Sequence, residues 1–193
     1  RGVRVGALDE VLQEGAGDEA ENRHVADRLV DLVNTNTELF HDSSDNCYAT
    51  FKHKGHRECW KIESSGFRNW LSYMYFLETH GAPSETALKA ALGTLFGQAK
   101  YEGAEKPVFR RVAKNDEALW IDLCDEEWKA IKVLPGSWEV VEDPPVMFVR
   151  STTMTPLPSP LEKGDLDPLW SLINIPDEDR ILLLCWMLEC FRI

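Results

Sequence analysis

The sequence predicts an α+β fold, in which an N-terminal helix, a β-hairpin and a two-helix unit are followed by an antiparallel β-meander and C-terminal helices. Apolar residues recur at helical spacing within residues 21–34 and 65–99, and they alternate with polar residues in short runs between 108 and 150. The 193 residues are 44% hydrophobic and include seven tryptophans. This composition excludes a disordered chain and is sufficient for a buried core.

The N-terminal part is expected to contain an arm, a helix and a hairpin. Residues 1–20 are rich in glycine and acids without a sustained period, which predicts a flexible acidic arm. An apolar helical stripe then extends from residue 21 to about Asn34. Residues 47–53 and 57–63 are rich in aromatic and β-branched residues, and Lys54-Gly55 between them predicts a hairpin turn.

Two helices follow the hairpin. Ser64-Ser65 provides an N-cap for a helix that ends at Gly81, and Pro83 begins a second helix that reaches about Ala99. The residues expected in the core are Phe67, Trp70, Leu71, Leu92 and Phe96. Such an αα-hairpin is compatible with a helix-turn-helix, although most short helical corners bind nothing.

From residue 105 the period changes to two. Five strand-like runs are separated by turn residues, which predicts an antiparallel meander over residues 105–160. The runs are 108–113, 118–123, 129–134, 138–142 and 146–150. Trp128 or Trp138 is expected in its core.

Residues 161–193 form C-terminal helices, the last of them apolar on every side and therefore buried or in contact with a partner. The sequence thus divides at residues 20/21, 104/105 and 160/161.

The charge is distributed unevenly along the chain. The formal net charge is −12, which argues against a general nucleic-acid or membrane binder. Residues 51–114, however, hold eleven lysines and arginines against six acids. This segment has a net charge of +5, whereas residues 1–50 carry −7 and residues 115–193 carry −10. Either the basic residues are scattered solvating charges, or they form a basic platform that faces phosphates.

Sequence motifs for metal binding and catalysis are weak. Cys47, His53, His56 and Cys59 lie within one hairpin and lack the spacing of a zinc site; a two-residue period places the two histidines on opposite faces. The five cysteines form no disulfide framework, so we expect mostly buried free thiols. No nucleophile elbow, phosphate-binding loop or dinucleotide-binding turn is present, so we expect no enzyme, no cofactor and no bound metal.

A resemblance to a known group of proteins rests on the order of short motifs across residues 22–193. These motifs are Phe40-His41, Tyr48-Ala49-Thr50, Gly55-His56-Arg57, Phe67-Arg68-Asn69-Trp70-Leu71, Gly81-Ala82-Pro83-Ser84, Arg111-Val112-Ala113, Ile121-Asp122-Leu123, Trp128, Trp138, Pro144-Pro145-Val146, Phe148, Arg150, Pro156-Leu157-Pro158, Leu172 and Asn174. Their succession resembles the region that precedes a replicative-helicase-like ATPase domain in primase-helicase-like proteins of phages and mobile elements.

This resemblance implies a non-catalytic accessory module of a DNA-replication ATPase that contacts the DNA backbone through residues 51–114. The partners implied are DNA and a downstream ATPase domain of the same polypeptide, with a homo-oligomeric full-length form and no membrane. The cations expected to contact phosphates are Arg57, Lys61, Arg68, Lys89, Arg110 and Arg111. Since the chain begins at Arg1 without a secretory leader, we expect a cytoplasmic fragment of a longer protein.

Two other functions remain open. The chain is alternatively an oligomerisation collar or interdomain scaffold of the same ATPase, without nucleic-acid contact, for which Trp170 and Trp186 are the candidate interface residues. A hydrolase or nuclease would require carboxylates such as Asp122, Asp125, Glu126 and Glu127 to hold a metal, although a solvated strand edge explains them better.

Arg150 is expected to form a structural ion pair with one of the acids.

Overall fold

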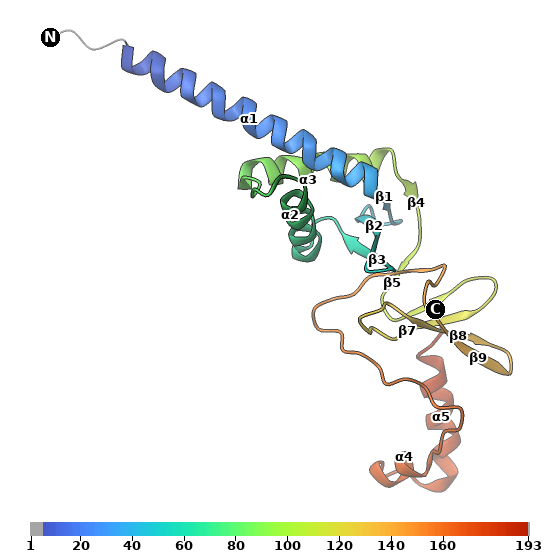
Figure 1. Ribbon diagram of the computed structural model, residues 1–193. Coiled ribbons are helices and arrows are strands. Elements are labelled where there is room, and N and C mark those ends of the chain that lie inside the picture. The colour runs from blue at the N-terminus through green and yellow to red at the C-terminus, as the bar shows by residue number, and fades with distance from the viewer. Residues whose placement is uncertain (1–5, 193) are drawn as a thin grey trace. The chain divides into compact units, whose positions relative to one another are not determined.

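The computed structural model describes the backbone of residues 6–192 and the side chains of residues 21–192 (Figure 1). The chain divides into two compact units, residues 1–108 and 109–193. Helices and strands follow one another in the predicted order, and the fold belongs to the mixed α+β class that the sequence predicts.

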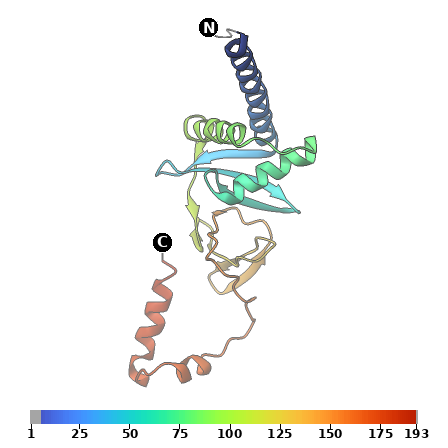
Figure 2. The same cartoon turned by 90° about the vertical axis from the view of Figure 1, so that its left-hand side faces the viewer.

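The first unit is a four-stranded sheet covered by helices. Its elements are α1 (Gly6–Asn36), β1 (Thr37–His41), β2 (Cys47–His53), β3 (His56–Lys61), α2 (Ser65–Thr79), α3 (Glu85–Tyr101) and β4 (Ala104–Glu105). The strand order is β3-β2-β1-β4; β2 is antiparallel to both of its neighbours, and the short β4 is parallel to β1. Figures 1 and 2 show the three helices on the same side of this sheet.

The core of the first unit lies between the helices and one face of the sheet. Phe67 and Leu71 of α2 are buried there as predicted, whereas Trp70, Leu92 and Phe96 are only partly buried against the same core. The main buried contributors are Leu29 and Val33 of α1, Ala49 and Phe51 of β2, and Leu88, Ala91 and Leu95 of α3. Each Å² of apolar surface that is buried contributes about 25 cal/mol to stability, so the burial of this cluster is the main source of stability of the unit.

The ends of the helices correct the predicted boundaries. Helix α1 begins at Gly6, in the segment where the sequence predicts an irregular arm, and it continues directly into β1, a strand that the sequence analysis missed. The predicted cap is present at Ser64, whose hydroxyl accepts a hydrogen bond from the Phe67 amide. His80, with φ 55°, closes α2 in the left-handed conformation that we expected of Gly81.

The second unit contains the predicted meander. Its elements are β5 (Val108–Phe109, at the boundary), β6 (Val112–Lys114), β7 (Leu119–Asp122), β8 (Ala130–Leu134), β9 (Ser137–Val141), β10 (Met147–Phe148), α4 (Asp167–Leu172), a 3₁₀ turn (Asp177–Asp179) and α5 (Arg180–Glu189). Strands β6 to β9 pair in sequence order, and β10 pairs with β5. The first of the five predicted runs is therefore divided between β5 and β6, and the last is shortened to β10, which pairs with β5 outside the meander sheet.

The tryptophan in the core of this unit differs from the prediction. Trp120 of β7 is 2% exposed and packs with Ala113, Ala130 and Phe148. Trp138 is 40% exposed, so its assignment to the core was wrong. Trp128 lies in a turn with φ 57° instead of on a strand, and its ring stacks under Arg150 at 4.0 Å from the guanidinium carbon to the ring centroid.

A buried ion pair joins the end of β7 to the segment that follows β10. Both carboxylate oxygens of Asp122, which is 1% exposed, accept hydrogen bonds from Arg150, at 3.0 Å from Nε and 2.6 Å from Nη2. The Arg150 guanidinium also donates to the carbonyl of Asp125. The prediction of a structural ion pair at Arg150 is therefore confirmed.

Replacing Arg150 is expected to destabilise the second unit strongly. Arg150→Ala leaves the Asp122 carboxylate buried without its charge partner, and we expect the free energy of unfolding in urea to fall by about 3–5 kcal/mol. The matched control is Arg192→Ala, which removes an exposed pair with Glu189 and should change this free energy by less than about 0.5 kcal/mol. Equal effects of the two substitutions would contradict a structural role for Arg150.

Candidate nucleic-acid interface

The six cations that the sequence predicts as phosphate contacts are divided between the two units. Arg57, Lys61, Arg68 and Lys89 belong to the first unit, whereas Arg110 and Arg111 belong to the second. Within the first unit they are spread over β3, α2 and α3. Neither unit taken alone therefore contains all six cations of the predicted basic platform.

At least three of the six cations are engaged in contacts within the fold. Lys61 Nζ donates to Asn46 Oδ1 at 2.9 Å and lies 3.5 Å from a Glu63 carboxylate oxygen. Arg68 pairs with Glu85 across the α2–α3 connection.

Arg111 is the third of these cations. It donates from Nη1 to the Asp122 carbonyl at 3.1 Å and from Nη2 to the Thr155 carbonyl at 3.0 Å. The extended segment near Thr155 is thereby fixed against the end of β7. Arg111 is therefore a structural residue of the second unit.

The hairpin turn between β2 and β3 gathers cations that are better placed. Residues 52–57 read Lys-His-Lys-Gly-His-Arg, three basic residues and two histidines with no acid, and we call this segment the basic tip. Lys52 lies directly opposite Arg57 in the strand register. Lys52 and Lys54 are exposed, and neither forms an ion pair or a hydrogen bond among the side chains of residues 21–192.

The geometry of the basic tip lowers the stability of the fold. Like charges directly opposite each other in a sheet are destabilising, as at Lys52 and Arg57. Lys54 has φ 48° and Gly55 has φ 92°, so both central residues of the two-residue turn are left-handed. This turn favours Asn or Gly at its first position, and a lysine there costs roughly 1 kcal/mol. The tip therefore holds positive charge at some expense of stability.

The helix-facing side of the tip is fixed by a chain of contacts. His56 Nε2 lies 3.0 Å from Glu58 Oε1, and Trp60 Nε1 donates to Glu58 Oε2 at 2.6 Å. Gly66 allows the Trp60 ring to lie against the first turn of α2, since a Cβ at Gly66 would come within 1.8 Å of that ring. Glu58 is buried, and both of its carboxylate oxygens are occupied by these neighbours.

The structure separates the four residues of the possible zinc cluster. His53 and His56 are direct cross-strand partners on one face, with ring centroids 6.2 Å apart, so the expectation that they point to opposite faces was wrong. Cys47 shares the helix-facing side of the sheet with Phe51, whereas Cys59 faces the other side opposite Thr50. Burial raises the pKa of Cys59 to about 12. No metal-binding group of three His, Cys, Asp or Glu residues occurs among the described residues.

The acidic cluster of the second unit is likewise used by the fold. Asp122 holds Arg150, and Asp125 accepts a hydrogen bond from the Lys129 amide at 2.9 Å. The Asp122 carboxylate also accepts from the Cys124 amide at 3.0 Å. These contacts give Asp122 and Asp125 structural roles.

The two candidate interface tryptophans differ in exposure. Trp186 of α5 is 65% exposed, together with Ile181, Leu182 and Leu188 on the same helix. Trp170 of α4 is partly covered by Arg180, whose guanidinium carbon lies 5.0 Å from the ring centroid. Of the two, Trp186 is thus the side chain available for a contact.

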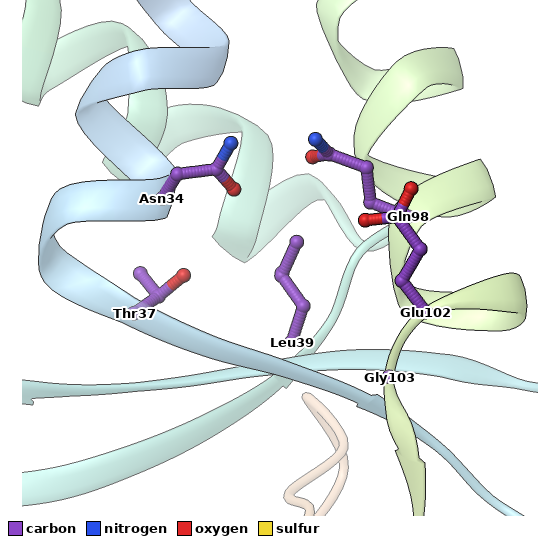
Figure 3. Close-up of a pocket in the computed structure, with 6 residues that line it drawn as sticks. All are labelled: Asn34, Thr37, Leu39, Gln98, Glu102 and Gly103. Carbon is purple, nitrogen blue, oxygen red and sulfur yellow. The ribbon is translucent and has the colours of Figure 1, made fainter.

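A polar pocket of about 330 Å³ lies at the ends of α1 and α3 (Figure 3). It is lined by Asn34, Thr37, Leu39, Gln98, Glu102 and Gly103. The amides of Asn34 and Gln98 face each other across it, and Gln98 Oε1 is buried without a hydrogen-bond partner among the described residues. Glu102 is the one titratable side chain among the described residues that line this pocket.

Comparisons with protein-family models, with curated proteins and with solved structures found no match to this chain. In the part of the chain that the structure describes, no helix has both the length and the apolar character needed to cross a membrane.

The Asn46 contact of Lys61 belongs to a turn whose stability should depend on pH. Asp42 in this β1–β2 turn accepts hydrogen bonds from the Ser44 amide, the Asn46 amide and side chain, and the Tyr48 hydroxyl. Burial disfavours the charged form of Asp42, but the hydrogen bonds from Asn46, Ser44 and Tyr48 outweigh it and hold its pKa below the usual value.

A lowered pKa stabilises the fold above the unfolded pKa of about 3.9, and this contribution is lost as the pH falls through the folded value. We therefore expect the free energy of unfolding to decrease between about pH 5 and pH 3 more steeply in the parent protein than in Asp42→Asn. Urea unfolding at a series of pH values measures this difference. Parallel pH profiles would show that Asp42 does not stabilise the turn.

Proposed function

We propose that this chain is a non-catalytic module that contacts the phosphate backbone of nucleic acid through the basic tip, residues 52–57. The observation that carries the proposal is the juxtaposition of Lys52, Lys54 and Arg57 in a strained turn, without an acid in the segment. A polyanion offsets the repulsion between these cations, and phosphate contacts of this kind provide most of the affinity of non-specific binding.

The wider context follows from the resemblance described above. In that context the module belongs to a DNA-replication ATPase of the primase-helicase type from a phage or mobile element, and it acts beside a downstream ATPase domain. The tip replaces the dispersed platform as the contact, because Lys52 and Lys54 are exposed there, whereas Lys61, Arg68 and Arg111 are engaged within the fold. Lys89 of the first unit and Arg110 of the second are also exposed.

The test is charge reversal at the tip. Lys52→Glu with Lys54→Glu and Arg57→Glu should abolish binding of a labelled oligonucleotide at low salt, measured by fluorescence anisotropy. In the parent protein the logarithm of the binding constant should decrease linearly with the logarithm of the salt concentration. Each of these phosphate contacts should add about 0.7–0.9 to the steepness of that decrease. Binding by this triple variant with parental affinity would refute the proposal.

A matched control carries the same change in net charge away from the tip. It combines Lys89→Glu, Arg110→Glu and Lys114→Glu at exposed positions that form no ion pair among residues 21–192. We expect this variant to lose much less affinity than the tip variant. An equal loss in both would show that the binding is a diffuse effect of net charge and not a property of the tip.

The exposed apolar side chains of α5 favour the collar as a second candidate function. In this function α5 mediates contacts between copies, and Trp186 and Leu182, both 65% exposed, are central. Sedimentation should then show association that increases with protein concentration and is lost in Leu182→Asp with Trp186→Asp. Leu161→Asp, at an exposed loop position, is the control. A monomer at every concentration would exclude the collar for this chain.

A further inference from the structure

The polar pocket at the ends of α1 and α3 is rich in hydrogen-bond acceptors. Thr37 donates its hydroxyl hydrogen to the Val33 carbonyl at 2.9 Å, so only the lone pairs of its oxygen remain for a ligand. Gln98 Oε1 is buried and accepts no hydrogen bond from residues 21–192. Glu102 adds a carboxylate, which accepts hydrogen bonds only when it is ionised. A ligand rich in hydrogen-bond donors therefore matches this lining.

The electrostatic environment of the pocket is negative. Helices α1 and α3 both end there, and the C-terminal end of a helix carries about half of an elementary negative charge. The last turn of α1 contains no basic residue, and Lys100 in the last turn of α3 pairs with Asp45 at 3.0 Å. The described residues that line the pocket include Glu102 but no lysine, arginine or histidine. A cation is therefore favoured in this position.

The side-chain oxygen of Gln98 points to a ligand more directly. Most buried polar atoms in proteins are hydrogen-bonded, and one that is left without a partner destabilises the fold. Figure 3 shows the Gln98 amide directed across the pocket toward Asn34. The Gln98 backbone carbonyl accepts hydrogen bonds from the amides of Glu102 and Gly103, at 2.9 and 3.0 Å, which fixes the end of α3. An N–H group of a ligand that reaches Oε1 removes the cost of the unpaired oxygen.

The base of the pocket is apolar and closely packed. A Cβ on Gly103 would lie 2.9 Å from the Leu39 carbonyl oxygen and 2.9 Å from Phe40 Cα, so only glycine lets the chain pass this close to β1. The Leu39 side chain projects into the pocket between the two amides (Figure 3). The pocket thus joins an apolar base to a polar rim, which suits a cation that carries a short alkyl chain.

We propose that this pocket binds a small organic cation with several N–H donors, an alkylguanidinium or an alkylammonium. Its charge lies beside the Glu102 carboxylate, its N–H groups donate to Gln98 Oε1 and Thr37 Oγ1, and its alkyl chain lies on Leu39. The volume of about 330 Å³ is at the lower end of the range of about 300–1,000 Å³ for small-molecule sites, which limits the ligand to a small one. The inference goes beyond the proposed function and does not depend on it.

The test is a titration of the isotope-labelled full chain with butylguanidinium, followed by NMR. We expect saturable shifts of the side-chain amide resonances of Asn34 and Gln98 and of the backbone amide of Gly103, at concentrations on the order of 1 mM or below. N-butylurea keeps the planar N–H donors without the charge, and butyltrimethylammonium keeps the charge without N–H donors. Each of these two control compounds should bind at least about tenfold more weakly than butylguanidinium.

Three variants assign the binding to the pocket. Glu102→Gln removes the charge but keeps the shape, and it should weaken butylguanidinium binding at least about tenfold. Gln98→Met replaces the amide by an apolar side chain of similar length. It should also weaken binding, but it should not lower the melting temperature, because no unpaired oxygen is then buried. The matched control is Glu105→Gln, which removes an exposed charge outside the pocket lining and should leave the affinity unchanged.

Three results would overturn the inference. The first is the absence of saturable shifts at these resonances with butylguanidinium. The second is equal affinity for butylguanidinium and for either control compound. The third is an equal effect of Glu102→Gln and Glu105→Gln on the affinity. All three leave the proposed contact with nucleic acid standing, because that contact is measured separately with oligonucleotides and with variants of the basic tip.

Discussion

The stack of Phe51 on Trp70 is the contact on which the arrangement of the first unit's surface depends. It joins β2 to α2 through two rings 4.0 Å apart, and Phe51 is 4% exposed. An aromatic pair of this kind contributes about 0.5–1.5 kcal/mol beyond the apolar area that it buries. Because Phe51 is fixed in this way, the next residues of the hairpin emerge at the edge of the helix layer. The hairpin that carries the basic tip is therefore held against α2 by core packing.

The tip and the rest of the first unit use their charges differently. Lys100 pairs with Asp45, Lys106 with Glu38 and Arg28 with Glu78, so these cations are balanced by acids within the fold. At the tip, like charges oppose each other across the two strands, and a lysine occupies a left-handed position. A local arrangement that costs stability is more often associated with function than with folding.

Much of the fold could be predicted from the sequence, whereas the roles of the cations could not. Helical and two-residue periods placed α2, α3 and the central strands of the meander close to their observed bounds, and Arg150 was expected in an ion pair. Strand β1 was missed because Thr37–His41 follows α1 without a turn residue between them. Lys61, Arg68 and Arg111 were assigned to DNA because their partners Asn46, Glu85 and Thr155 are distant in the sequence and are brought near only by folding. The run of basic residues at 52–57 is visible in the sequence. It was not singled out because the charge was summed over residues 51–114.

The most direct test of the account is the substitution Lys54→Asn, measured for both thermal stability and affinity for an oligothymidylate. Asparagine tolerates the left-handed conformation better than lysine but carries no charge. The account predicts that the melting temperature increases while the affinity falls severalfold. A variant that is more stable and binds as tightly as the parent would contradict the claim that the tip is built to bind phosphate.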